Sequence, residues 1–424
     1  MHNVVLVTID SLRSDVSQEA IPTFTKLADE GLEFETAVAP GPRTPSSIPP
    51  SMTGEFYRTE KSSMAGRRNG IRTHIVPNET IPERFAKRDY TTVGFSSNPW
   101  TASDTGFDSI FDEFYELNPN TDNDIDTLPK TPVVQTIDRF LKAIDREEFL
   151  GWQGKREWFT HWTSFQQQIF EKIDNLSEPY FVWIFLMDTH QPTIVPQSFR
   201  RETNLFKTYY SLYQFNSSRS SQLSDRVQKW LDEGYRDAAR SADRFLKDIR
   251  NEISANDILV VHSDHGEARG EHGTNGHEYQ LYEENIKVPM AAHHPDLSGS
   301  ITDQFSLIDL PDLLDTLAVN PKIDPENWGR QFIASMSESD ETARVRSEMI
   351  NYTPHRRSLR GDRFKLIETP DDHLLFDLEA DPNEKENVAE SHPELVDAFL
   401  DILNARCAKR EEQRKVIETV QEIY

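Results

Sequence analysis

The sequence predicts an α/β protein with a mostly parallel sheet, helices on both faces of that sheet, and a small C-terminal antiparallel sheet with a helix. Short apolar, β-branched runs alternate with helical patterns along most of the chain, as in βαβ units. One run, Tyr180–Met187, is apolar without interruption, which is typical of a central strand buried on both faces. After Leu317 a polar connection leads to shorter strands and one terminal helix. We therefore expect a large domain at residues 1–335 and a small α+β subdomain at 336–424.

The strands of the large sheet are predicted from apolar runs rich in Val, Ile and Phe. In chain order they are Val4–Ile9, Thr91–Phe95, Tyr180–Met187, Ile258–Val261 and Val288–Ala292. A helix is predicted at Pro22–Gly31, where Phe24, Leu27 and Ala28 share one face and the glycine ends the helix. The small sheet and last helix are predicted from Glu348–Asn351, Phe364–Ile367, Leu374–Asp377 and a helix start near Pro393.

Three segments between these strands differ in composition. Asn118–Pro129 is polar and acidic and is predicted to be a loop. Ser217–Gly234 opens polar and serine-rich and leads into a helix predicted at Tyr235–Ile249. Val133–Leu176 holds helical patterns rich in aromatic residues, which we interpret as helix packing rather than as a ligand cage. The aromatic residues are Phe140, Phe149, Trp152, Trp158, Trp162, Phe165 and Phe170.

The chain is strongly acidic, with a formal net charge of −26 spread along its 424 residues. This charge argues against nucleic acid or an anionic membrane as a partner. Arg outnumbers Lys by 30 to 16. An acidic, lysine-poor surface suits high salt, because screening removes the self-repulsion that such a charge creates. The composition therefore predicts a halophilic protein, from a haloarchaeal source.

Cysteine content and hydropathy indicate where in the cell the protein is expected. Cys407 is the single cysteine, which excludes a disulfide framework and a four-cysteine zinc site. No basic and apolar leader precedes the first strand, and no run approaches the roughly 18 apolar residues that span a membrane. We expect a cytoplasmic protein without a membrane span. Its oligomeric state leaves no trace in the sequence.

Two predicted strands end in acidic residues. Val4–Ile9 is followed by Asp10, and the run that starts at Ile258 is followed by Asp264 and His265. An Asp at a strand end is most often a cap or turn residue. In open α/β sheets, however, ligands bind outside the carboxyl ends of the strands. Two carboxylates and an imidazole there predict one divalent cation, which could be Ca²⁺, Mg²⁺ or Mn²⁺, with Zn²⁺ also compatible.

Five further segments, which follow one another along the chain, resemble segments of a known family. They are IPTFTKLADEGLEFETAVAP, GPRTPSSIPPSMTG, FSLIDLPDLLDTL, LRGDRFKLI and LLFDLEADPNEKENVAESHPELV. Together with the Asp-His strand end, they resemble the sulfatase family of the alkaline phosphatase superfamily over most of the chain. The resemblance implies an alkaline-phosphatase-like fold, a catalytic domain followed by a C-terminal subdomain, and hydrolysis of an anionic ester.

The resemblance also implies a nucleophile nine residues before Thr53-Gly54, which is Thr44. Most sulfatases have a cysteine or serine there that becomes formylglycine, so this chain is a threonine variant. Ile48 replaces the arginine usual in the same motif. A threonine hydroxyl at a helix N-terminus beside a cation can still attack an electrophilic centre. Thr44 as a simple helix cap is compatible with this role.

The remaining site residues follow from the resemblance. Arg13 matches an arginine of the family's first motif, and its guanidinium suits an anionic oxygen of the substrate or an acidic neighbour. Surface ion pairing is the alternative role. His190, in MDTHQP, resembles a histidine that faces the substrate and can protonate a leaving group. His277 and Asn98 lie at or near positions of lysines that bind the transferred group. Ser11 stands where many sulfatases have a second aspartate, and is a weak ligand or none.

We expect a metal-dependent hydrolase that cleaves a sulfate or phosphate ester through Thr44, on a small-molecule or glycan substrate. The first alternative is a phosphodiesterase or a transferase of a phosphoryl-type group, acting on a sugar or lipid head group. The second is a degenerate, non-catalytic sulfatase. His272 and Asp188 could hold a second metal in two-metal relatives, but one metal is expected.

Overall fold

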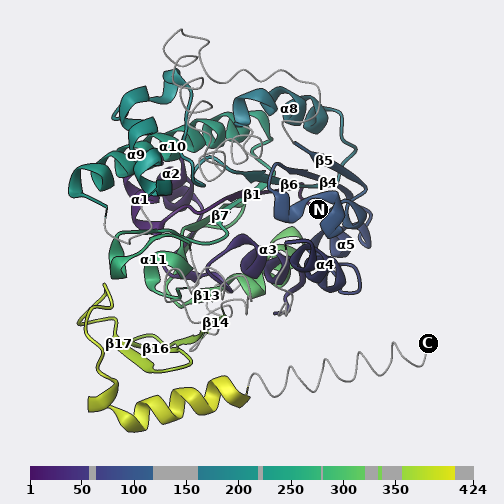
Figure 1. Ribbon diagram of the computed structural model, residues 1–424. Coiled ribbons are helices and arrows are strands. Elements are labelled where there is room, and N and C mark those ends of the chain that lie inside the picture. Colours follow the sequence, from purple (N-terminus) through teal and green to yellow (C-terminus); the bar gives the residue numbers. More distant parts are fainter. Residues whose placement is uncertain are drawn as a thin grey trace.

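The computed structural model describes residues 1–56, 64–117, 161–217, 223–277, 280–319, 333–336 and 356–405. Its centre is an eight-stranded sheet between two layers of helices (Figure 1). The strands in spatial order are β12 (Gly299–Ile301), β2 (Leu32–Phe34), β11 (Met290–His293), β7 (Ile258–Ser263), β1 (Val4–Ile9), β6 (Tyr180–Leu186), β4 (Thr91–Ser96) and β5 (Glu113–Glu116). The strands from β7 to β5 are parallel, and β11 pairs antiparallel with both β7 and β2. The mostly parallel α/β sheet is confirmed.

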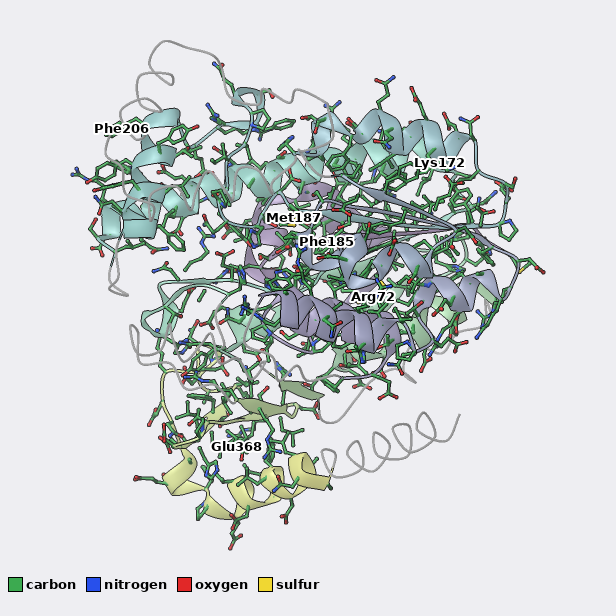
Figure 2. The ribbon with its side chains drawn as sticks, turned by 45° about the vertical axis from the view of Figure 1, so that its right-hand side comes forward. Arg72, Lys172, Phe185, Met187, Phe206 and Glu368 are labelled. Carbon is green, nitrogen blue, oxygen red and sulfur yellow. The ribbon has the colours of Figure 1, made fainter. Side chains whose placement is uncertain are left out.

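Strand β6 lies inside the sheet between β1 and β4. Its side chains alternate between two buried cores, with Phe181, Trp183 and Phe185 on one face and Val182 and Ile184 on the other. Figure 2 shows Phe185 and Met187 near the centre of the molecule. Because both faces are covered, this strand has no polar side, which explains its uninterrupted apolar run.

Helices cover both faces of the sheet, as predicted. One face carries α3 (Thr44–Thr53), α4 (Met64–Ile75), α5 (Ile81–Ala86) and α12 (Leu310–Val319). The other carries α1 (Ser14–Ala20), α2 (Pro22–Glu30), α8 (Gln166–Asp174) and α10 (Asp225–Glu252), with α9 (Leu205–Ser217) packed against α10. Two small sheets accompany them, formed by β10 (Lys287–Val288), β3 (Ala37–Val38) and β13 (Phe305–Ser306), and by β8 (Ala268–Arg269) and β9 (Asn275–Gly276).

Two predicted elements have the wrong bounds. Helix α10 begins at Asp225, ten residues before the predicted start at Tyr235, because Val227 and Leu231 continue its buried face toward the N-terminus and Gly234 is tolerated inside it. The predicted strand Val288–Ala292 is two strands, β10 and β11, which belong to different sheets. Pro289 separates them, since proline has no N–H to donate to a ladder.

The aromatic residues after position 160 pack against helix α10. Trp162, Phe165 and Phe170 contact the buried cluster that includes Phe245 of α10, which confirms helix packing for these three. The earlier aromatic residues, the predicted loop Asn118–Pro129, the predicted strand Glu348–Asn351 and Cys407 lie outside the described residues.

The C-terminal sheet is antiparallel and packs against a helix at residues 393–405 (Figure 1). Its strands are β14 (Ile333–Met336), β15 (Arg357–Arg360), β16 (Phe364–Glu368) and β17 (His373–Asp377). The predicted subdomain boundary after residue 335 falls inside β14, which pairs with β15. Among the described residues, no helix combines the length and the hydropathy that crossing a membrane requires.

Candidate active site

The chemistry-bearing residues lie at the carboxyl ends of four adjacent parallel strands. Asp10 follows β1, and Asp264 follows β7. These strands pair in parallel with Ile9 opposite Ser263, so the two aspartates leave the sheet side by side. Asn98 lies beyond the end of β4 and His190 beyond the end of β6. The fold therefore gathers at one edge residues that are far apart in the sequence.

Asp10, Asp264 and His265 form the tightest acidic cluster. Each offers one ligand atom, and these atoms all lie within 4.8 Å of one another. All three side chains are fully buried, at 0% exposure. Two carboxylates and one imidazole in a buried pocket match the donor set of a divalent cation.

The imidazole of His265 has a defined orientation. Its Nδ1 lies 2.8 Å from the carbonyl oxygen of Gly266, and a carbonyl can only accept, so Nδ1 carries the proton. The lone pair of Nε2 then faces Asp264 Oδ2 at 3.4 Å and Asp10 Oδ1 at 3.7 Å. Burial lowers the pKa of His265 to about 4, so the ring is neutral at neutral pH. A neutral imidazole held by a carbonyl is the usual form of a histidine ligand.

The contacts of Asp264 also suit a cation ligand. Its Oδ1 accepts the backbone N–H groups of Ser11 and His265 at 3.1 and 2.9 Å. Its Oδ2 is buried and accepts no hydrogen bond from the described residues. Burial, and then the negative charge of Asp10, raise the pKa of Asp264 well above its ordinary value. The Nε2 lone pair of His265 and the carboxylate oxygens of Asp10 and Asp264 thus lie close together, and such a set of acceptors is suited to hold a cation.

Ser11 shapes the turn between the two aspartates. Its φ of 59° is in the left-handed region, which is uncommon for a residue other than glycine. This conformation aims its N–H at Asp264, while its hydroxyl donates to Asp10 Oδ1 at 2.6 Å. Ser11 therefore orients both carboxylates, a role that the sequence did not reveal.

Thr44 is the first residue of α3 and lies against this cluster. Its hydroxyl is 3.3 Å from Asp10 Oδ2 and 3.4 Å from His265 Nε2. The helix is fixed in place by Ser47, whose hydroxyl donates to the carbonyl oxygen of Asp264 at 2.6 Å. Ile48, at the position of the arginine that is usual in this motif, is buried in the apolar core and contributes no polar group to the site. The nucleophile candidate thus lies at a helix N-terminus, where backbone N–H groups favour anionic oxygens.

Asn98, which the resemblance places near the position of a lysine that binds the transferred group, contacts both Asp10 and Thr44 in the structure. Its amide Nδ2 donates to Asp10 Oδ2 at 2.8 Å and lies 3.5 Å from Thr44 Oγ1. Its Oδ1 accepts the N–H of Trp100, which fixes the amide orientation. The available signal was its position just after the predicted strand Thr91–Phe95, at the same sheet edge as Asp10.

His190 and His277 extend the site as a row of imidazoles. The ring of His277 lies 4.8 Å from that of His265 and 5.0 Å from that of His190, between ring centroids. His190 and His277 are partly exposed, whereas His265 is buried. The row therefore leads from the buried cluster toward partly exposed side chains.

Arg13 points away from the cluster. Its guanidinium donates to both carboxylate oxygens of Asp15, to the carbonyl oxygen of Glu267, and pairs with Glu271 at 3.0 Å. Burial alone would lower the pKa of Arg13, but the hydrogen bonds and charge of Asp15, with the charge of Glu271, raise it above its usual value. These contacts join the segment after β1 to the segment after Asp264. They support a positioning role and give the substrate no free guanidinium.

The two residues considered for a second metal have other partners. His272 bonds to Glu284 Oε1 at 2.8 Å and to the carbonyl oxygen of Glu384 at 3.0 Å. Asp188 lies beside Ser241 and His161, each at 3.2 Å. Among the described residues, Asp10, Asp264 and His265 are the one group close enough to share a cation.

Asp188 gives a pH-dependent stability prediction. Burial raises its pKa to about 7, so the folded chain keeps a proton that the unfolded chain releases near pH 4. The resulting stability is complete below about pH 4 and is lost as the pH rises to about 7, by roughly 4 kcal/mol at most. Asp188→Asn should lack this loss. Urea unfolding of both proteins from pH 4 to pH 8 measures it, and parallel stability curves would contradict the prediction.

Comparisons with known proteins show the family and the fold of the chain. The sequence model of the sulfatase family matches residues 2–318. No curated protein matches the sequence. A phosphonate monoester hydrolase of Agrobacterium radiobacter has a similar fold, with a TM-score of 0.68 and 14% identity over 97% of this chain and 96% of its own. A 2-O GAG sulfatase gives 0.67 and 14% over 98% and 94% of the two chains.

A third solved structure is that of a protein in complex with its substrate, D-glucosamine-2-N,6-O-disulfate. It has a TM-score of 0.64 and 12% identity, covering 97% of this chain and 98% of its own. At such identities the similarity concerns the fold. The family match spans most of the chain and includes every residue of the site described above. The chain belongs to the sulfatase family and is a sulfuric or phosphoric ester hydrolase of the alkaline-phosphatase-like fold.

Proposed function

We propose that the protein is a metal-dependent hydrolase of anionic esters that uses Thr44 as its nucleophile. The observation that carries the proposal is the Thr44 hydroxyl at the N-terminus of α3, within 3.4 Å of both Asp10 and His265. Asp10, Asp264 and His265 would hold one divalent cation, and Ca²⁺, Mg²⁺ and Mn²⁺ all suit these donors, with Zn²⁺ also compatible. When bound, the cation supplies positive charge that favours ionised Thr44 and the anionic oxygens of the substrate.

The chain's own residues supply the remaining steps. Thr44 Oγ1 releases its proton to solvent and forms a bond to sulfur or phosphorus, while the ester oxygen on the opposite side leaves with the electron pair of the broken bond. His190, in its protonated form, gives a proton to that leaving oxygen. Asn98 and His277 donate hydrogen bonds to the anionic oxygens, and backbone N–H groups of α3 add to them. Arg13 holds the two cation-binding segments together. Water then attacks the threonine ester and restores the hydroxyl.

The identity of the nucleophile bears on the transferred group. Formylglycine can release sulfate by reforming its aldehyde, but a threonine ester must be attacked at sulfur or phosphorus. A phosphate ester or diester is therefore at least as suitable as a sulfate ester. The fold neighbours include a phosphonate monoester hydrolase, a 2-O GAG sulfatase and a protein in complex with its substrate D-glucosamine-2-N,6-O-disulfate. We propose a small-molecule or glycan ester as the substrate.

A transferase or phosphodiesterase acting on a sugar or lipid head group is the second candidate. The same observation favours it, since an acceptor alcohol can replace water in the attack on a threonine ester. A degenerate, non-catalytic protein is the third candidate. The buried, mutually oriented Asp10, Asp264, His265 and Thr44 argue against it, because two neighbouring buried carboxylates cost free energy unless a cation lies between them.

Paired nitrophenyl substrates test the proposal. Nitrophenyl sulfate, phosphate and a phosphodiester are offered with Mn²⁺, Mg²⁺ or Ca²⁺. Turnover of at least one ester that is lost with chelator supports a metal-dependent hydrolase. Turnover that appears only with an added alcohol supports the transferase, and no bound cation supports the non-catalytic protein. We also propose a cytoplasmic protein and, from the net charge of −26, a salt-adapted one. Activity should then be retained in high salt and fall when the salt is diluted.

A further inference from the structure

A buried network of charges joins the C-terminal sheet to the main domain. Lys365 of β16 is fully buried, at 0% exposure, although lysine is almost never buried without partners. Its Nζ donates to Glu283 Oε1 at 3.0 Å and pairs with Glu384 Oε1 at 2.8 Å. Arg360 of β15 also donates to Glu283, at 3.1 Å. Two cations of the C-terminal sheet thus hold a carboxylate of the main domain.

Glu283 opens the short helix α11 (Glu283–Ile286), which lies directly against the cation-binding segment. The N–H of Gly266 donates to the carbonyl oxygen of Asn285 at 2.8 Å. A Cβ atom on Gly266 would lie 2.1 Å from the carbonyl oxygen of Glu284, so no larger residue fits. The carbonyl oxygen of Gly266 accepts from His265 Nδ1. The orientation of His265 therefore depends on the carbonyl group of Gly266, a residue whose N–H is bonded to α11.

A second set of contacts ties the same places together. Glu384 Oε2 accepts the N–H of Glu283 at 2.6 Å. His272 connects Glu284 Oε1 to the carbonyl oxygen of Glu384, at 2.8 and 3.0 Å, and stacks on Tyr282 with 3.6 Å between ring centroids. The C-terminal subdomain thus bonds to both the carboxylate and the backbone N–H of Glu283, the first residue of α11.

The two faces of β16 have different partners. Lys365 and Ile367 point toward the main domain, where Ile367 shares a buried cluster with Ile286 of α11. Leu366 points the other way and is buried against Phe399 of the terminal helix. Because side chains alternate along a strand, Lys365 contacts α11 while its neighbour Leu366, which is also buried, does not.

We propose that Lys365 is a positioning residue for the cation site, acting through Glu283, α11 and Gly266 on the ligand His265. This inference rests on the proposed function, because it requires the cation to bind at Asp10, Asp264 and His265. The C-terminal subdomain then completes the site without contributing a ligand. Groups that orient a histidine ligand from outside typically change metal affinity by about 10- to 100-fold. Lys365 does not contact His265 itself but acts through α11 and Gly266, so we expect an effect near tenfold, the lower end of that range.

The test is calorimetric titration of the full chain with Mn²⁺, at a temperature where circular dichroism shows each variant folded. Lys365→Met should weaken Mn²⁺ binding roughly tenfold. Leu366→Ala is the matched control, since it destabilises the same subdomain from the opposite face of the same strand. Its Mn²⁺ affinity should stay within about twofold of wild type, although its thermal midpoint falls.

A second variant guards against misfolding. Lys365→Met with Glu384→Gln removes the cation and one carboxylate, so that Glu283 keeps Arg360 as its partner. It should also bind Mn²⁺ more weakly than wild type. Wild-type affinity in a folded Lys365 variant, or an equal loss in Leu366→Ala, would overturn the inference alone. A wild-type chain that binds none of Mn²⁺, Mg²⁺ and Ca²⁺ would overturn the proposed function and this inference together.

Discussion

Replacing Thr44 by alanine should lower turnover by at least about 10³-fold, because no other hydroxyl of the described residues lies as close to both Asp10 and His265. Mn²⁺ affinity should change by only a few-fold, since the two carboxylates and the imidazole remain. Steady-state rates with the best nitrophenyl ester, beside calorimetric Mn²⁺ titration, separate the two effects.

Two variants sharpen the result for Thr44. Thr44→Ser keeps a hydroxyl at the same position, primary in place of secondary, and should retain much of the activity. Ser46→Ala is the control within the same helix turn, since the Ser46 hydroxyl donates only to the local carbonyl oxygen of Arg43 at 3.0 Å. If Thr44→Ala kept wild-type rates, the nucleophile would be water or another group, and the hydrolase would need a different mechanism.

Replacing Asp264 by asparagine should have opposite effects with and without cation. In the cation-free protein, Asp264 and Asp10 are buried carboxylates with one neutral imidazole between them, so removing one charge should stabilise the fold. With saturating Mn²⁺, the wild type gains the free energy of binding and the variant gains little. A loss of at least about 100-fold in affinity corresponds to roughly 2.7 kcal/mol.

Thermal unfolding of both proteins, in chelator and in excess Mn²⁺, reads out this reversal. The variant should unfold at the higher temperature in chelator and at the lower temperature with Mn²⁺. Asp257→Asn is a suitable control, because Asp257 is a buried aspartate at the start of the same strand, where it bonds to Asn3 and Tyr180. It should lower both midpoints alike. An identical cation response in wild type and Asp264→Asn would remove Asp264 from the cation site.

The fold could be predicted from periodicity because the physical signals are local. The continuous apolar run of β6 reports burial on both faces, and the glycine after α2 reports its end. The bounds failed where tertiary packing decides. The first turns of α10 look polar in sequence, yet Val227 and Leu231 lie against α9, and Pro289 divides one apolar run between two sheets.

The candidate site was only partly visible in the sequence. Asp10, Asp264 and His265 could be singled out because acidic residues at the ends of buried strands must meet at one sheet edge. Ser11 could not, since its role depends on a positive φ that aims its N–H at Asp264. Arg13 resembled a substrate-binding arginine, but only its surroundings show that Asp15, Glu271 and Glu267 already occupy its donors.

The sequence by itself determined the family, the parallel core and the residue types that can hold a cation, because each follows from local patterns along the chain. The tertiary structure decided which of these residues meet and what else they contact. Asn98 reaches Asp10 across 88 positions, and Lys365 holds Glu283 across 82. Such contacts depend on distances in three dimensions, which a one-dimensional pattern does not contain. For that reason, the C-terminal subdomain read as an appendage in the sequence, whereas in the fold it contacts the segment that orients His265.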